Sequence, residues 1–172
     1  MFSAAFTNQF IISCLIGLLV WAAVSDFRTF TIPNRVSLGM LILYPAYVLA
    51  APTAIPWLFA LAMGVVVFFI GCALFAMKAM GGGDVKLLAV TAIWAGPQHF
   101  LEFFAVMGVA GLLLAIFVAA RTALAEARVG EPRTFIGTIA GFRHVPILKL
   151  TVPYGVAVSA AGFYVALRLL GP

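Results

Sequence analysis

The sequence predicts an all-α integral membrane protein with about six transmembrane helices. Of its 172 residues, 65% are hydrophobic and only 9% are charged, and the mean hydropathy is +1.20. A soluble domain of this size carries about a quarter charged residues. The apolar residues also form long runs, as expected for helices of the roughly 20 residues that span a bilayer. We expect residues 1–172 to form a single membrane domain.

Six apolar runs are separated by charged loops or by prolines. Pro33 marks the entry to the second run, because proline is tolerated in the first turn of a helix. Residues 36–77 carry no charge, and Pro52 and Pro56 mark the turn between the two spans that this length allows. The fourth run is short, so it either includes Asp84 at the bilayer boundary or lies at the centre of the bundle. The predicted spans are residues 8–25, 34–51, 56–77, 84–97, 101–120 and 150–168.

The basic residues lie almost entirely in three loops. Nine of the ten Lys and Arg residues fall within 26–35, 78–86 and 121–149, and the tenth is Arg168. By the positive-inside rule these loops are cytoplasmic and both chain ends lie on the other side. The net charge of +5 is therefore a topology signal, and no nucleic-acid partner is expected. Apolar residues at helical spacing between 135 and 142 predict either a helix on the membrane surface or a solvated loop with buried anchors.

Two acidic residues stand beside predicted membrane spans. Asp26 follows the first span, and Asp84 opens the fourth, so the topology places both on the cytoplasmic side. A charged residue at the end of a membrane span is energetically costly and therefore indicates a functional site. Two carboxyl groups held together in a low dielectric share a proton, so one can activate water while the other polarises a peptide carbonyl. We therefore expect Asp26 and Asp84 to form one catalytic pair. The other acids, which we expect to be solvated or interfacial, are Glu102, Glu126 and Glu131.

Three consecutive glycines, residues 81–83, precede Asp84. Glycine allows positive φ and the close approach of another chain. Gly81 and Gly83 could thus admit an extended substrate strand and let Asp84 turn towards Asp26. A flexible turn between two helices would also account for the glycines.

Other catalytic schemes fit the sequence poorly. Cys14 and Cys72 lie inside apolar runs without a C-x-x-C pair, so we expect no metal site and no cofactor. His99 and His144 fall on opposite sides of the membrane and outside any H-E-x-x-H motif. Ser159 lacks a G-x-S-x-G setting and a histidine at its depth, which disfavours a serine protease.

Three pieces of the sequence resemble the type IV prepilin peptidases. Gly81-Gly82-Gly83-Asp84-Val85-Lys86 matches their G-x-G-D-x-K signature, and Asp26 followed by Ile32-Pro33-Asn34 is similar to their first aspartate with its downstream I-P-N. Val152-Pro153-Tyr154-Gly155 is similar to their P-[FY]-G element. Presenilin-like proteases share G-x-G-D, but they have a tyrosine before the first aspartate, where this chain has Ser25. The resemblance implies that Asp26 and Asp84 are catalytic and that the residues around the active-site loops are Gly81, Gly83, Lys86, Pro33, Asn34, Pro153, Tyr154 and Gly155.

The resemblance also implies a function. We expect a multi-pass aspartic endopeptidase of the bacterial inner membrane that removes the short basic leader from prepilins or pseudopilins at the cytoplasmic face. Larger members of the family carry an insertion with paired C-x-x-C motifs and also N-methylate the pilin. The insertion is missing here, so we expect peptidase activity alone. The compact form resembles the subgroup serving Flp-type (tight-adherence) pili, with pilus assembly machinery and membrane lipids as further partners.

Three alternatives remain open. The chain is more distantly similar to archaeal preflagellin peptidases. It could instead be a small transporter in which acids at the membrane edge carry protons or cations. A structural assembly partner with an inactive site is the third possibility.

Overall fold

The computed structural model describes residues 4–51, 53–129 and 153–171. Within these ranges the chain is entirely helical, as predicted, and contains no strand. Three helical segments are long and apolar enough to cross a membrane, and a shorter apolar helix ends the bundle. The helices are α1 (Ala4–Thr29), α2 (Asn34–Ala50), α3 (Trp57–Ala76), α4 (Gly82–Val129) and α6 (Tyr154–Leu170).

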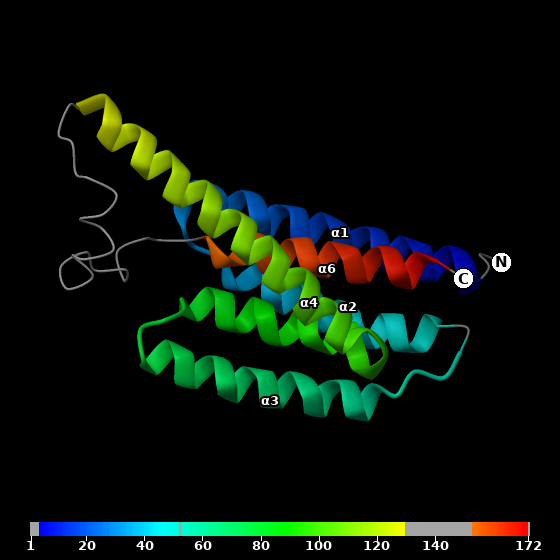
Figure 1. The fold of residues 1–172 in the computed structure, drawn as a ribbon. Coiled ribbons are helices and arrows are strands. Elements are labelled where there is room, and N and C mark those ends of the chain that lie inside the picture. Colours follow the sequence, from blue (N-terminus) through cyan, green and yellow to red (C-terminus); the bar gives the residue numbers. More distant parts are fainter. Residues whose placement is uncertain (1–3, 52, 130–152, 172) are drawn as a thin grey trace.

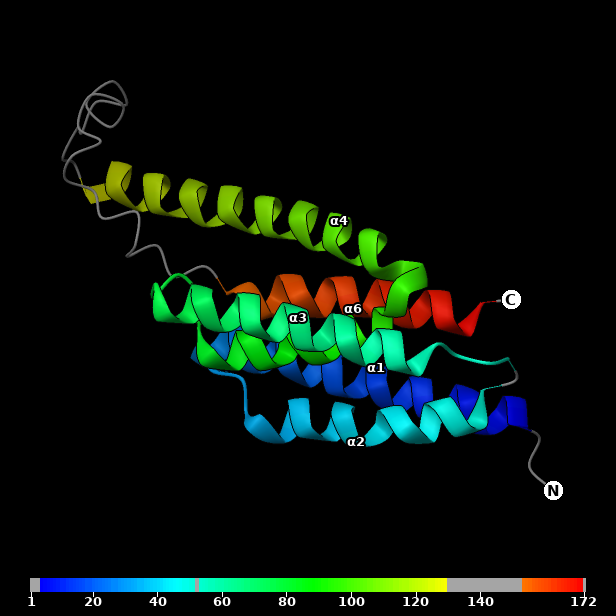
Figure 2. The ribbon, with the colours of Figure 1, turned by 90° about the horizontal axis from the view of Figure 1, so that it is seen from below.

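The helices lie side by side in one elongated bundle (Figure 1, Figure 2). The connection from α1 to α2, residues 30–33, and the connection from α3 to α4, residues 77–81, lie at the same end. We call it the aspartate end, because Asp26 and Asp84 adjoin these two connections. The start of α1 and the end of α6 lie together at the opposite, far end.

Prolines set the start of three helices. Pro33, Pro56 and Pro153 directly precede α2, α3 and α6. Proline suits this place because its φ is fixed and the N–H that it lacks would have no partner inside the helix. The observed starts at residues 34, 57 and 154 therefore follow from the local sequence.

The predicted polar loops at the aspartate end are wrong in extent. We expected a loop over 26–35, but α1 continues to Thr29 and includes Asp26 in its last turns. We expected a loop over 78–86, but α4 begins at Gly82. A charged residue indicates a loop only where its side chain is solvated by water. Here the Asp26 side chain is 3% exposed and is hydrogen-bonded to another helix, so the helix continues through it.

The segments predicted at 84–97 and 101–120 correspond to two helices that meet at a break at Gly96 and together form the element α4. Gly96 has φ 55° and ψ −175° inside α4, and Pro97 follows. Glycine adopts this left-handed φ without the cost that a Cβ would bring. The second half of α4 then runs back towards the aspartate end (Figure 1). The helix continues to Val129, beyond the predicted end at 120, whereas the surface helix considered between 135 and 142 lies outside the described residues.

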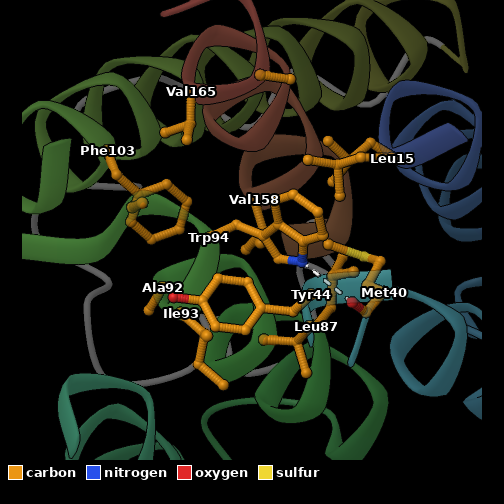
Figure 3. Close-up of a cluster of buried hydrophobic side chains, with 14 of the residues drawn as sticks. Leu15, Met40, Tyr44, Leu87, Ala92, Ile93, Trp94, Phe103, Val158 and Val165 are labelled. Carbon is orange, nitrogen blue, oxygen red and sulfur yellow. Dashed lines mark hydrogen bonds between the residues drawn. The ribbon is translucent and has the colours of Figure 1, made fainter. Parts of the chain in front are cut away.

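The first half of α4 lies at the centre of the bundle, one of the two places expected for the short fourth run. Most residues from Val85 to Ala95 are buried. Trp94 donates its Nε1–H to the carbonyl of Met40 at 3.1 Å, and its ring meets that of Tyr44 edge-on, with centroids 5.5 Å apart (Figure 3). Large apolar side chains on the outside of the bundle, such as Phe69 of α3, are exposed, as is usual for a surface that faces lipid.

Candidate active site

Asp26 binds the amino-terminal end of α6. The backbone N–H of Val156 donates to its Oδ2 atom at 3.2 Å, and Gly155 lies directly against the same carboxyl group. The first N–H groups of a helix have no partner inside it and carry a partial positive charge, so they form a natural site for a carboxylate. Pro153 precedes the helix and provides no side-chain cap. The cap is supplied by Asp26 of α1 instead.

Asp84 is the third residue of α4, and its carboxyl group lies against Gly81 just before the helix. An acid at this position commonly reaches back to the residue that caps its own helix. Its carboxyl group also interacts electrostatically with Asp26. Its Oδ1 atom is buried and has no hydrogen-bond partner among the described residues.

The structure therefore brings the two predicted aspartates together. They come from α1 and α4, they interact electrostatically with each other, and both lie beside Gly155 at the start of α6. We call Asp26 and Asp84 the aspartate pair. Three helix ends meet at this point, and a chain lacking any one of them would lack part of the site.

Two glycines leave room for the carboxyl groups. A Cβ on Gly155 would stand 2.8 Å from Oδ2 of Asp26, and a Cβ on Gly81 would stand 2.9 Å from Oδ2 of Asp84. Real Cβ atoms do not approach oxygen this closely, so both positions must lack a side chain for the carboxyl groups to stay where they are.

Ile32 lies between the starts of α4 and α6. Its Cδ1 atom would be 2.5 Å from a Cβ on Gly155, and its Cβ and backbone oxygen would be 3.2 Å and 3.3 Å from a Cβ on Gly83. The chain that approaches Gly83 is thus Ile32 of the same protein. None of the three glycines 81–83 has a positive φ, because Gly96 is the only described glycine that has one.

The other residues predicted around the site lie at its edges. Lys86 donates from Nζ to Oδ1 of Asn34 at 2.9 Å, so this pair links the start of α2 to the start of α4. Pro33 precedes α2 and Pro153 precedes α6. The side chain of Tyr154 is 42% exposed.

A cavity of about 230 Å³ lies beside Asp84. Its walls are residues 30–32 and Asn34 on one side and residues 81–84 on the other. Phe30, in this wall, has a left-handed φ of 51°, and Lys78 in the neighbouring connection has a φ of 59°. Such conformations cost a non-glycine residue about 1–2 kcal/mol and tend to occur at functional sites.

Sequence reasoning missed three contributions to the site. Ile32 was noted only as part of a motif, Phe30 was not considered, and the N–H of Val156 has no side-chain signature. The proline that precedes α6 was the available signal, because it marks a helix start whose free N–H groups need acceptors. In the described part of the chain, no three His, Cys, Asp or Glu side chains are grouped so that they could hold a metal ion.

Comparison with known families gives one result. The model of the type IV leader peptidase family matches residues 13–116, more than half of the chain. The matched range contains both members of the aspartate pair and ends before α6. No curated protein and no solved structure matches the chain.

Proposed function

This chain belongs to the type IV leader peptidase family, and on that premise we propose that Asp26 and Asp84 catalyse the removal of the leader peptide from a type IV prepilin or pseudopilin. The observation that carries the proposal is that the two carboxyl groups lie together beside Gly155 at the start of α6. The family supports a membrane peptidase with a prepilin substrate. The roles of the two residues and the details below belong to the proposal.

The reaction needs only water and the aspartate pair. The pair holds one proton, because two adjacent carboxyl groups do not both ionise readily. The ionised group takes a proton from water as the water oxygen attacks the peptide carbonyl carbon, and the protonated group gives its proton to the carbonyl oxygen. The resulting diol then collapses. The C–N bond breaks, the proton taken from water passes to the leaving amine, and a hydroxyl proton of the diol restores the original state of the pair.

The contacts of the pair favour one division of roles. Asp26 receives the N–H of Val156 at a helix start, and such a donor stabilises a carboxylate. Asp84 has a buried Oδ1 without a partner among the described residues, so this atom is free to carry the proton for the substrate carbonyl. Asp26 would then activate the water and Asp84 would polarise the scissile bond.

We propose further that the cleaved leader is short and basic, that cleavage takes place at the cytoplasmic face of the bacterial inner membrane, and that the pilin is of the Flp type. The nine Lys and Arg residues in the predicted cytoplasmic loops support this orientation. The mature pilin is expected to leave the enzyme without N-methylation.

Co-expression with a candidate Flp-type prepilin, followed by mass measurement of the pilin N-terminus, tests the proposal. Asp26→Asn and Asp84→Asn should each abolish processing while the protein remains in the membrane. Glu102→Gln is the matched control. Glu102 is an acid at the far end, where it contacts His99, Tyr164 and Arg168, and this variant should process the prepilin normally.

Normal processing by either aspartate variant would overturn the assignment of the pair. An ion flux in liposomes that depends on Asp84, with no cleavage of any prepilin, would favour the transporter alternative. A methylated N-terminus would contradict the expectation of peptidase activity alone.

A further inference from the structure

A groove of about 470 Å³ runs along the outside of the bundle between α2 and α3. Both helices pack against α4, but in the described part of the chain they share no extensive interface with each other. The first half of α4 therefore forms the floor of the groove. Gly64 of α3 lies against this floor, and a Cβ there would stand 2.2 Å from Ile93, so the glycine lets α3 approach α4 closely.

The lining of the groove changes from polar to apolar along its length. At the aspartate end it contains Asn34 and Lys86, which are hydrogen-bonded to each other. Seven residues further along the same two helices, Leu41 and Ile93 line it. Seven residues of helix rise about 10 Å, so the groove extends roughly two helical turns away from the aspartate end.

The walls of the groove are exposed and apolar. Leu38 of α2 is 55% exposed, and Val65 and Phe68 of α3 are 52% and 39% exposed. Inside a bilayer such walls gain little from apolar burial alone, because lipid tails are equally apolar. A helix would be held there by close packing of its side chains and by polar contacts at one end.

The groove adjoins the cavity beside Asp84. Asn34 lines both, so the polar end of the groove is the end nearer the aspartate pair. A protease whose acids lie at the end of a membrane bundle must hold a peptide bond at that end while the rest of its substrate stays in the bilayer. The groove provides a binding surface for the part of the substrate that stays in the bilayer.

We propose that this groove binds the apolar helix of the substrate on the carboxyl side of the cleaved bond. The start of that helix lies at Asn34 and Lys86, and its following turns pack against Leu41, Val65 and Ile93. This inference rests on the proposed function, and it adds where the part of the substrate that is not removed is bound.

Blocking the groove tests the proposal by kinetics. Val65→Trp places an indole in the groove, whereas Val66→Trp makes the same change at a neighbouring residue that is 57% exposed and does not line the groove. With detergent-solubilised enzyme and full-length prepilin, Val65→Trp should raise KM about tenfold, equivalent to a binding loss of about 1.4 kcal/mol, with kcat retained. Val66→Trp should behave as wild type. Unchanged KM in Val65→Trp, or equal losses in both variants, would overturn the proposal.

Cross-linking tests the binding of the substrate in the groove without relying on cleavage. Cys14 and Cys72 are replaced by serine, Asp84→Asn keeps the substrate intact, and a single cysteine is introduced in the apolar segment of the prepilin. Leu41→Cys in the groove should form a disulfide with it, and Ile42→Cys, which is 67% exposed outside the groove, should not. Equal cross-linking at both positions, or none at Leu41→Cys, would overturn the proposal. Failure of the proposed function would appear separately, as absence of cleavage by the wild-type chain.

Discussion

The backbone N–H of Val156 donates a hydrogen bond to Oδ2 of Asp26 across 3.2 Å and 130 residues of chain. This contact joins the end of α1 to the start of α6 and fixes one carboxyl group of the aspartate pair. A carboxylate at a helix start is stabilised by donors that no residue of that helix can satisfy. The same contact therefore caps the start of α6 and positions Asp26.

Replacing Gly155 by alanine should inactivate the enzyme. The added Cβ would stand 2.8 Å from Oδ2 of Asp26 and 2.5 Å from Ile32, so the carboxyl group must move. A displacement of about 1 Å at a catalytic group can cost about 100-fold in rate, and we expect a loss of that order in prepilin cleavage. Gly17→Ala is the control, because a Cβ there meets nothing within 4 Å. Full activity of Gly155→Ala would contradict the site described above.

Gly83 and Gly82 are neighbours that should respond differently to alanine. A Cβ on Gly83 would stand 3.2–3.4 Å from the Cβ and backbone of Ile32, whereas a Cβ on Gly82 would meet only the ring of Phe75 at 3.4–3.9 Å. Gly83→Ala should push α4 from the 30–33 connection and lower kcat/KM about tenfold, a cost of about 1.4 kcal/mol in the barrier. Gly82→Ala should retain activity and gain up to about 1 kcal/mol in stability. The comparison is made by cleavage kinetics and by thermal unfolding in detergent.

The hydrogen bond between Lys86 and Asn34 should appear as a coupling energy between the two residues in the free energy of unfolding. The two atoms are 2.9 Å apart and the contact is exposed, so its contribution to the free energy of unfolding is about 0.5 kcal/mol. Lys86→Met and Asn34→Ala should each lose this amount. The double variant should lose less than the sum of the two, because they remove the same contact. Strict additivity in a double-mutant cycle of unfolding would show that the bond does not contribute.

Trp94→Phe tests the polar contact at the centre of the bundle. The change keeps an aromatic ring beside Tyr44 but removes the N–H that Met40 accepts at 3.1 Å. Hydrogen bonds between membrane helices are worth about 1 kcal/mol, and we expect a loss of that size in the free energy of unfolding. Trp57→Phe is the control because Trp57 is 50% exposed. Equal stability of the two variants would contradict a role for this bond.

Much of the helical framework could be predicted, because it depends on local signals. The apolar runs and the prolines before α2, α3 and α6 indicate the helices directly. The end of α1 was missed because Asp26 resembles a loop residue until its partner on α6 is known. The break at Gly96 was predicted, because Gly-Pro ends the apolar pattern of one helix, and the structure has two helices that meet at this residue.

Prediction of the site was limited for the same reason. The carboxyl groups could be proposed as partners from their position beside apolar runs and from their predicted side of the membrane. The position of Ile32 between Gly83 and Gly155 could not be predicted from the sequence, because it depends on how three separate segments pack together. The N–H groups at the start of α6 are backbone atoms, and no residue type indicates them.

The cap that Asp26 supplies to α6 also has a consequence for biosynthesis. Asp26 and Asp84 emerge from the ribosome well before Val156, whose N–H holds Asp26. The aspartate pair is therefore fully positioned only when α6 has entered the membrane. With the roles proposed for the pair, a nascent chain should be unable to cleave neighbouring membrane proteins until α6 has been made.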